Sequence, residues 1–405
     1  MMFDSIRTLD DFDFKGKKVL LRLDLNSPLD PDTKDFLDDR RFISHRDTIL
    51  ELLKKKAKIA ILAHQGRPGD DDFVTLENHA KKLSEVIGHD VKYVDSIFGK
   101  GANDAVNALK PGEIIMLENT RFYSEEVLKR PADVQAKTIF VKKLAPLFDV
   151  FVNDAFAVAH RSQPSVVGFP MVMPAVAGRL MEKEVSTILG TLKKPKKPVT
   201  FILGGTKADD SIKVARQALE HNDCRILTGG VVGNIFLAAK GYRLGEPSIE
   251  FIRGKKMSDQ IDVAKEILNK YGEKIVTPVD VALDRNNERV EIPVGDLPQN
   301  YRISDIGKET VKKYVDIINS SGTVFANGAL GVFEDKNFAF GTESIIRAIA
   351  DSKAFSVIGG GHTVAAARQL DVGDKIDHIS SGGGACMDLL AGEKLPGIEA
   401  LRKDK

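Results

Sequence analysis

The sequence has no tryptophan and only two cysteines, Cys224 and Cys386, among its 405 residues. Two cysteines cannot build a disulfide framework or a four-thiolate zinc site, so we expect buried thiols in a reducing compartment. The sequence also lacks an excess of charge, because 59 lysines and arginines meet 58 aspartates and glutamates, giving a net charge of +1. No global field therefore marks the protein for nucleic acid or an anionic membrane, and any attraction for an anion must come from local clusters.

Long apolar runs are missing as well. The most apolar stretch, residues 166–178, contains Pro170 and Pro174 and is shorter than the ~20 residues that a membrane helix requires. The first ten residues carry acids where a signal peptide has a basic and then an apolar run. We expect a cytoplasmic protein with no nucleic-acid partner and no membrane partner.

What the sequence does contain is an alternation of short apolar runs with helical patterns. Helical spacing of apolar residues marks 46–56, 78–88 with Gly88 as a C-cap, and 177–190. The apolar runs are too short for helices and mostly do not alternate, which is typical of strands buried on both faces. They lie at 19–25, 59–63, 114–117 and 150–152, and again at 199–203, 225–227, 275–276, 323–326, 355–358 and 377–379.

This order predicts an α/β fold with two Rossmann-like three-layer α/β/α lobes, each with a parallel sheet, joined by a hinge helix. We expect residues 164–178 to form a surface connection and residues 285–303, where Val290, Ile292 and Val294 alternate with polar residues, to form a small antiparallel excursion. The expected division is an N-terminal domain 1–172, a hinge helix 173–190, a C-terminal domain 191–388 and a terminal segment 389–405 that returns to the first domain.

In the first half, polar and cationic residues follow almost every predicted strand. The segments are Arg22-Leu-Asp-Leu-Asn26, Ala63-His-Gln-Gly-Arg67, Leu117-Glu-Asn-Thr-Arg121, and Asn153-Asp154 with His160-Arg161 behind it. Ligands of open α/β sheets bind beyond the carboxyl ends of strands, so Arg41, His64, Arg67, Arg121 and Arg161 are expected to converge there. A single arginine of this kind is more often a surface or ion-paired residue than part of a site. Together they favour a small, highly anionic metabolite.

In the second half, the strand ends are rich in glycine. The loops are Leu203-Gly-Gly-Thr-Lys207, Thr228-Gly-Gly230, Asn327-Gly-Ala-Leu-Gly331, Gly359-Gly-Gly-His362 and Gly382-Gly-Gly384. Glycine lets backbone N–H groups approach a phosphate at a helix N-terminus, so five such loops favour a nucleotide. Lys207 is the expected cation for a transferring phosphate, while Glu334 suits either a ribose hydroxyl or a solvated surface position.

One anion-binding half and one nucleotide-binding half together predict a two-substrate phosphotransferase, whose lobes close to exclude water. Neither a P-loop nor an early G-x-G-x-x-G is present, which argues against P-loop NTPases and ordinary dinucleotide binders. A non-catalytic two-lobed binding protein for an anionic sugar phosphate is the alternative. A dehydrogenase with an unusual dinucleotide fold is a third, weaker reading.

The motifs resemble those of the phosphoglycerate kinase family over nearly the whole chain. Arg22-Leu-Asp-Leu-Asn-Ser-Pro28 is similar to the family's RVDFNVP, and His64-Gln-Gly-Arg-Pro68 is similar to HLGRP. Further resemblances are Leu117-Glu-Asn-Thr-Arg-Phe122 to LENxRF, Asn153-Asp-Ala-Phe156 with Ala159-His-Arg161 to NDAFGTAHR, Leu203-Gly-Gly-Thr-Lys207 to LGGAK, Asn327-Gly-Ala-Leu-Gly-Val-Phe-Glu334 to NGPMGVFE, Gly359-Gly-Gly361 to GGGDS and Ser381-Gly-Gly-Gly-Ala385 to TGGGA.

The resemblance implies reversible phosphoryl transfer from 1,3-bisphosphoglycerate to ADP, giving 3-phosphoglycerate and ATP, by direct in-line transfer after hinge closure. It implies that the first domain binds the phosphoglycerate through Asp24, Leu25, Asn26, Arg41, His64, Gln65, Gly66, Arg67, Arg121 and Arg161. It implies that the second domain binds the nucleotide through Gly204, Gly205, Lys207, Asn327, Glu334, Gly359, Gly360, Gly361 and His362. The residues expected to stabilise the transferring group are Arg41, Lys207, Gly360 and Gly383.

Three departures from the family pattern point to an archaeal-type branch. Ser211 stands where the family has a second lysine, with Lys213 nearby, and Ala329 replaces a proline. His362 replaces the aspartate that helps to hold the Mg²⁺-nucleotide, and a neutral imidazole is a poor ligand for that hard ion. We therefore expect no dedicated protein metal site: Mg²⁺ would be held by phosphate oxygens, water or another acid such as Asp210. The expected assembly is a monomer or a small homo-oligomer.

Overall fold

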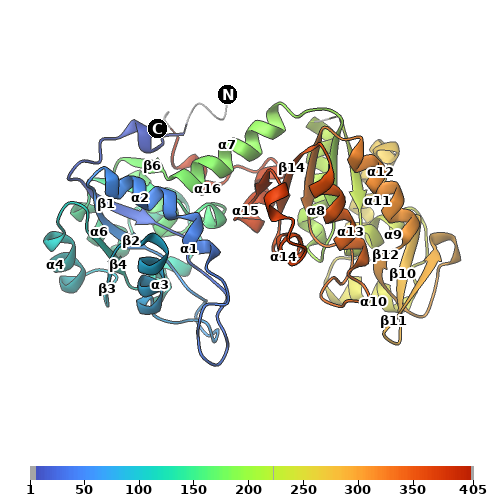
Figure 1. Cartoon of the computed structure of the whole chain (residues 1–405), viewed down its shortest axis with the longest axis horizontal. Helices are drawn as coiled ribbons and strands as arrows, with labels where there is room; N and C mark the ends of the chain where they lie inside the picture. The colour runs from blue at the N-terminus through green and yellow to red at the C-terminus, as the bar shows by residue number, and fades with distance from the viewer. Residues whose placement is uncertain (1–5, 222, 403–405) are drawn as a thin grey trace. The chain divides into compact units, whose positions relative to one another are not determined.

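The computed structural model describes residues 6–221 and 223–402. The chain divides into two compact units, the first running to Ser186 and including the segment from Lys394, the second covering Thr187–Glu393. Each unit holds a six-stranded parallel sheet covered by helices, so the predicted α/β class is confirmed (Figure 1).

The sheet of the first unit has the strand order β3-β4-β2-β1-β5-β6. Its strands are β1 (Lys18–Arg22), β2 (Lys58–Leu62), β3 (Val91–Val94), β4 (Ile114–Leu117), β5 (Val150–Asn153) and β6 (Ala175–Ala177). Its helices are α1 (Arg40–Ser44), α2 (Arg46–Lys54), α3 (Glu77–Ile87), α4 (Lys100–Ala108), α5 (Ala132–Gln135), α6 (Ile139–Leu144) and α16 (Pro396–Glu399). The four predicted strands are found with ends shifted by a few residues at most, whereas the short strands β3 and β6 were not predicted.

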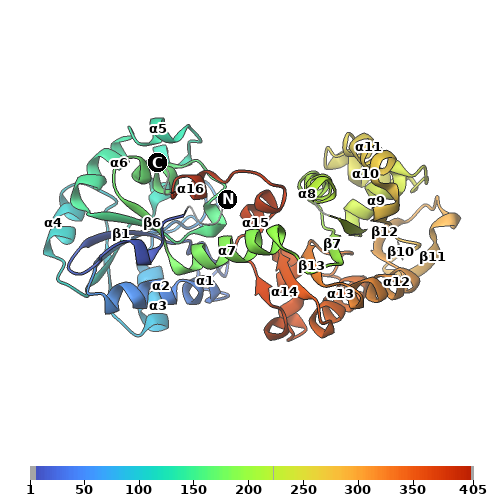
Figure 2. The same ribbon diagram turned by 90° about the horizontal axis from the view of Figure 1, so that it is seen from above.

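Both faces of this sheet are covered. Alternate residues of a strand point to opposite faces. Val19 and Leu21 belong to the core cluster that also contains Ile49 of α2 and Leu83 of α3. On the other face, the Phe151 ring stacks on that of Phe169 at 5.4 Å. Figure 2 shows α2 and α3 on one side of β1 and α5 and α6 on the other, a three-layer arrangement.

The expectation that residues 164–178 form a surface connection was wrong. Val166, Val167 and Phe169 are fully buried, and Ala175–Ala177 is the edge strand β6, paired with β5. Apolar residues with interspersed prolines do not distinguish a surface linker from an irregular segment of core. Here Phe169 lies in the core because its ring packs against the rings of Phe140 and Phe151. The ring centroids are 5.5 Å and 5.4 Å apart, respectively.

The second unit has a main sheet of order β15-β14-β13-β7-β8-β9 and a small antiparallel sheet of order β11-β10-β12. The main strands are β7 (Val199–Leu203), β8 (Cys224–Thr228), β9 (Ile275–Val276), β13 (Thr323–Asn327), β14 (Phe355–Gly359) and β15 (His378–Ile379). The small sheet contains β10 (Asp280–Arg285), β11 (Glu288–Pro293) and β12 (Arg302–Ile306), which confirms an antiparallel excursion.

Helices cover both faces of the second main sheet as well. They are α8 (Ala208–His221), α9 (Gly230–Ala239), α10 (Glu246–Gly254), α11 (Gln260–Tyr271), α12 (Lys308–Asn319), α13 (Phe340–Asp351), α14 (Gly361–Gln369) and α15 (Gly383–Leu390). Val324 and Ile358 pack with Tyr314 of α12 and Ile346 of α13 in one core cluster. Figure 2 shows α8 and α9 on the opposite side of β7 and β13 from α12 and α13.

Helix α7 (Arg179–Lys193) connects the two units. The boundary between them lies within this helix, between Ser186 and Thr187. Within the first unit, α7 begins at Arg179, whose guanidinium pairs with Asp10, Glu51 and Glu182 at 2.7 Å each. The short helix α16 also belongs to the first unit, where the Gly397 N–H donates to the Ala159 carbonyl at 2.8 Å. Cys224 and Cys386 are buried and form no disulfide. None of the described helices is both long enough and apolar enough to span a bilayer.

Candidate functional site

In the first unit, the polar segments predicted from the sequence follow four strands that are neighbours in the sheet, in the order β4-β2-β1-β5. Because the strands are parallel, their carboxyl ends lie at one edge, and the segments after them meet there. The cluster so formed, which we call the basic cluster, consists of Asp24, Asn26, Arg41, His64, Arg67, Arg121 and Arg161.

Asp24 is the acid of the basic cluster and is almost fully buried. Its carboxylate accepts from Arg41 and from the Asn26 N–H, the latter at 3.2 Å. Burial alone would raise the pKa of Asp24, but the charges of Arg41 and the neighbouring groups outweigh it and hold the pKa well below its usual range. Asp24 therefore stays ionised and orients Arg41 from α1.

A hydrogen-bonded chain ties Asp24 to the start of helix α7. His45 Nε2 lies 3.1 Å from the Asp24 backbone nitrogen, and His45 Nδ1 lies 2.8 Å from Asp154 Oδ2. The other oxygen of Asp154 accepts from the backbone N–H groups of Leu180 and Met181, which are free donors in the first turn of α7. His45 and Asp154 are thus positioning residues that sequence reasoning missed, although Asp154 lay within a quoted motif.

His64 differs in kind from the arginines around it. It is buried, and its Nδ1 lies 3.0 Å from Nη2 of the fully buried Arg22. Burial and the charge of Arg22 lower the pKa of His64 well below its usual 6.5. His64 therefore belongs to the cluster as a neutral imidazole and does not add to its positive charge.

Arg121 is almost fully buried and Arg161 is partly buried, and their charges influence one another. Burial and the charge of Arg161 lower the pKa of Arg121 to about 10. Burial also lowers the pKa of Arg161, partly offset by Asp24, and the charge of the exposed Arg67 lowers it further. Several guanidinium groups held this close together repel one another, and an anion between them removes that repulsion.

The loop after β2 is shaped by Gly66, whose φ is +66°. A Cβ at Gly66 would lie 2.6 Å from the backbone of Asp72, so a larger residue does not fit. The Gly66 N–H donates to Asn26 Oδ1 at 2.8 Å, and the Gly66 carbonyl accepts from Arg121 at 2.5 Å. Gln65 is fully buried and donates to the Ser27 carbonyl at 3.0 Å. The loop therefore holds its neighbours through backbone groups.

A second buried residue set supports the basic cluster from beneath and was not found from the sequence. Arg22 Nε donates to Ser165 Oγ at 2.9 Å, and the Ser165 hydroxyl donates to Glu126. Both Arg22 and Glu126 are completely buried. The motif containing Arg22 was recognised, but Ser165 and Glu126 lie far along the chain in segments that carry no strand signal.

In the second unit, the glycine loops after β7 and β13 are packed backbone to backbone. The Gly205 N–H donates to the Ala329 carbonyl at 2.6 Å and the Gly204 N–H to the Asn327 carbonyl at 2.9 Å. A Cβ at Gly328, which has φ +87°, would collide with the Gly204 carbonyl. Close packing of the two loops is thus the reason for glycine at these positions.

The glycine loops after β14 and β15 join the same edge. Gly360 has φ +82° and precedes α14, and a Cβ on it would lie 2.8 Å from Asn327 Oδ1. A Cβ at Gly383, the first residue of α15, would lie 3.5 Å from the Gly360 Cα. The N-termini of α14 and α15 therefore lie side by side, and a helix N-terminus is a favourable place for a phosphate.

A cavity open to solvent lies beside these loops in the second unit. Of the predicted nucleotide residues, Gly205, Glu334 and His362 line it, with His362 Nδ1 3.6 Å from Glu334 Oε1. Gly204, Lys207, Asn327 and the 359–361 loop do not line it. Much of the remaining lining was not predicted, because it lies on elements such as α9, α10, β12 and the loop after β9, where the sequence carries only core patterns. Among these residues are Asn234, Ser248, Phe251, Pro278 and Arg302.

The acids near Lys207 bear on Mg²⁺. Burial, and then the neighbouring Asp209, raise the pKa of Asp210, while the charge of Lys207 opposes them. No group of three or more His, Cys, Asp or Glu side chains suited to a metal is found among the described residues. The few carboxylates near Lys207 suit an ion that arrives bound to the nucleotide phosphates. Mg²⁺ commonly binds in this way, with at most one or two protein carboxylates.

Comparison with known proteins gives consistent matches over the whole chain. The family model described as phosphoglycerate kinase matches residues 9–393. The phosphoglycerate kinase of Methanothermus fervidus is 51% identical over 98% of this chain and 97% of that protein, and that of Methanococcus maripaludis is 52% identical over 98% of each. The crystal structure of phosphoglycerate kinase from Pyrococcus horikoshii has a TM-score of 0.90 at 44% identity over 98% of both chains. That from Coxiella burnetii has a TM-score of 0.83 at 31% identity, again over 98% of both.

Proposed function

The chain belongs to the phosphoglycerate kinase family, in its archaeal-type branch, and we propose which of its residues carry out that family's reaction. The enzyme transfers a phosphoryl group reversibly between the carboxyl group of 3-phosphoglycerate and ADP or ATP, a step of glycolysis and gluconeogenesis. The observation that supports the assignment most directly in the fold is the basic cluster at four neighbouring strand ends.

The first unit binds the phosphoglycerate. Arg67, Arg121 and Arg161 take its phosphate, because planar guanidinium groups match phosphate oxygens in pairs. Arg41, oriented by Asp24, faces the carboxyl end of the substrate. The hydrogen-bonded loop residues Asn26, Gln65 and Gly66 shape the site around the substrate. His64 adds a neutral N–H donor.

The second unit binds the nucleotide at its glycine loops. The phosphates lie against the N–H groups at the starts of α8, α14 and α15, and Glu334 bonds the ribose. Mg²⁺ would be held by phosphate oxygens and Asp210, and when bound it neutralises charge on the phosphates.

The transfer itself needs little proton movement. In one direction an ionised carboxylate oxygen attacks the terminal phosphorus of ATP, and in the other a β-phosphate oxygen of ADP attacks the acyl phosphate. What remains is in-line alignment and stabilisation of charge on the transferring group. Lys207, Arg41 and the N–H groups at Gly360 and Gly383 perform that role.

A coupled assay tests this proposal by following ATP formation from ADP and 1,3-bisphosphoglycerate, paired with a calorimetric titration with ADP alone. The expected result is turnover that requires Mg²⁺, together with ADP binding in the absence of phosphoglycerate. ADP binding without turnover, or neither, would overturn the proposal, and the second outcome would favour a non-catalytic two-lobed binding protein.

A further inference from the structure

One cation in the cavity of the second unit has no role in the reaction described so far. Arg302, the first residue of β12, lines that cavity and is partly buried. Its burial lowers its pKa, partly offset by the charge of Asp284. No carboxylate or carbonyl among the described residues accepts a hydrogen bond from its guanidinium. The donors of this partly buried guanidinium are thus not used within the protein and are open to a ligand.

The Arg302 guanidinium is held in place by an aromatic ring. Its central carbon lies 4.0 Å from the centroid of the Phe251 ring on α10, the geometry of a cation–π contact. Ser248 of the same helix accepts from the Ile303 N–H at 3.0 Å, which ties α10 to β12. The planar group is therefore fixed between two connected elements, and its N–H donors remain along its edge.

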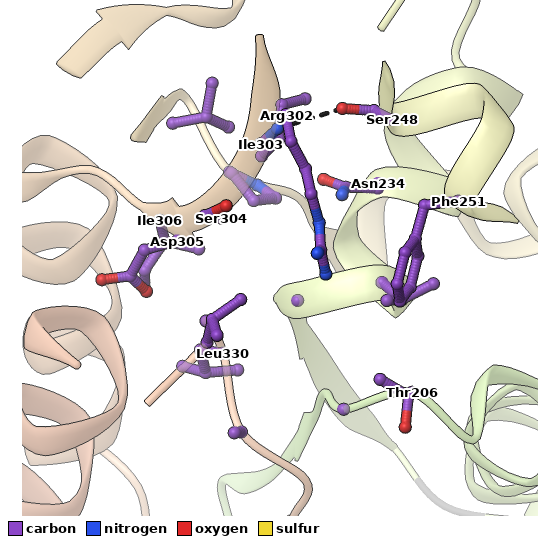
Figure 3. A pocket seen from close by; sticks show the side chains of 18 of the residues that line it. Thr206, Asn234, Ser248, Phe251, Arg302, Ile303, Ser304, Asp305, Ile306 and Leu330 are labelled. Atoms are coloured by element: carbon purple, nitrogen blue, oxygen red, sulfur yellow. Dashed lines mark hydrogen bonds between the residues drawn. The ribbon is translucent and has the colours of Figure 1, made fainter. Parts of the chain in front are cut away.

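Figure 3 shows the Arg302 side chain running from its strand into the middle of the lining residues, with the Phe251 ring beside it. The Asn234 amide faces the same space, whereas the Asp305 carboxylate is turned away. Asp305 has its own partner, because Arg289 Nη1 lies 2.8 Å from its Oδ2. Arg302 is thus directed at whatever occupies the cavity.

This end of the cavity suits a flat base rather than phosphates. Its walls include Phe251, Val281 and Ile303, which are apolar or aromatic, as in most cofactor pockets. The glycine loops, which suit phosphates, form another part of the lining through Gly205 and Gly230. We place the base beside Arg302 because the proposed function puts the nucleotide in this cavity.

We propose that Arg302 reads the nucleobase and makes this chain accept 6-oxopurine nucleotides, such as GDP, alongside ADP. Guanine presents two acceptors on one edge, O6 and N7, which match the donor fork of arginine in a paired contact. Adenine presents N7 beside an N6 amino group, so one donor of the fork meets another donor there. The Asn234 amide offers both an acceptor and donors, and it suits either base.

The test compares equilibrium binding of ADP, GDP and IDP to the full chain by calorimetry, for wild type, Arg302→Met and Arg302→Lys. IDP keeps O6 and N7 but lacks the 2-amino group, so it isolates the edge that Arg302 would contact. In Arg302→Met, GDP and IDP affinities should fall about tenfold to one-hundredfold relative to ADP. Arg302→Lys, which keeps the charge but not the fork, should lose most of that preference too.

The matched control is Arg285→Met. Arg285 is exposed on β10 and also lies over an aromatic ring, Tyr301 at 5.2 Å, but it does not line the cavity. Its removal should leave all three affinities unchanged.

A GDP-to-ADP affinity ratio that stays within twofold in Arg302→Met would overturn the inference. An equal loss for all three nucleotides would also overturn it, because that result indicates a phosphate contact or a packing role. The coupled assay separates this question from the proposed function. If no turnover occurs but the affinity ratio follows Arg302, the proposed function fails and the base-reading role stands.

Discussion

Nη2 of Arg22 lies 3.0 Å from Nδ1 of His64 in the interior of the first unit. A guanidinium can only donate hydrogen bonds, so Nδ1 of His64 must be the accepting, unprotonated nitrogen. The ring proton then resides on Nε2, and the imidazole is neutral. Arg22 thereby makes His64 a directed N–H donor in the basic cluster, while the positive charge of the cluster comes from the arginines.

Replacing Arg22 tests how strongly this arrangement holds the unit together. Arg22→Met should lower the free energy of unfolding by about 3–5 kcal/mol, because it leaves the buried Glu126 without its cation. The double variant Arg22→Met, Glu126→Gln should recover part of that free energy. The measurement is urea unfolding of the single variant, the double variant and wild type. Equal stability of the single and double variants would show that Glu126 and Arg22 are not coupled.

The stability of the first unit should fall in mild acid because of His79. Burial lowers the pKa of His79 to about 3, against 6.5 for the exposed group. Between these values the unfolded chain binds a proton that the folded chain does not, so stability is lost as pH falls below about 6.5. The loss is about 1.4 kcal/mol per pH unit.

This slope can be measured by urea unfolding at pH values from 4.5 to 7.5. His64 contributes with the same sign, because its pKa is also lowered by burial. His79→Gln should therefore reduce the slope without removing it. An unchanged slope in His79→Gln would mean that His79 is not neutral in the folded state.

Lys207→Ala should lower kcat about 10²–10³-fold and change either KM much less, because a charge on the transferring group is stabilised mainly in the transition state. Lys213→Ala, on the helix α8 that follows Lys207, is the matched control. Its ammonium is exposed and lies 4.0 Å from Glu393, so its loss should leave kcat within a few-fold of wild type. A kcat for Lys207→Ala within a few-fold of wild type would remove Lys207 from the catalytic role.

Arg67→Ala should raise the KM for 3-phosphoglycerate about ten- to one-hundredfold, because it removes charge-assisted hydrogen bonds to an anion. The KM for ATP should stay close to the wild-type value. Lys92→Ala, an exposed lysine on β3 paired with Glu113 at 3.7 Å, controls for a general change in surface charge. An unchanged KM for 3-phosphoglycerate in Arg67→Ala would exclude Arg67 from the site.

Gly328→Ala should destabilise the second unit by about 1–3 kcal/mol and weaken ADP binding, because the residue has φ +87° and a Cβ there meets the Gly204 carbonyl. Gly190→Ala in α7 is the contrasting substitution. Nothing lies within 4 Å of its Cβ position, and alanine favours helix, so stability should rise slightly. Thermal unfolding and ADP titration of both variants check this, and equal behaviour would contradict the close packing of the loops.

Most strands could be predicted because their signal is local. Runs such as 114–117 and 199–203 are short, apolar and bounded by polar or glycine-rich segments, and they coincide with β4 and β7. The edge strand β3 has only one buried residue of four, and β6 has only three residues, so neither produces such a run. Likewise, the burial of residues 164–169 depends on Phe140 and Phe151, which the segment itself does not reveal.

The sequence by itself determined the α/β class, the antiparallel excursion and the strand ends at which arginine or glycine gathers, because these features depend on neighbouring residues in the chain. Only the tertiary structure decided that His64 is neutral, that Glu126 and Arg22 support it, and that Phe251 and Arg302 face one cavity. The protonation state of a side chain depends on its burial and on nearby charges. A cavity wall depends on side chains that come from separate helices and strands. Folding brings these groups together across long stretches of chain, and no local pattern encodes their contact.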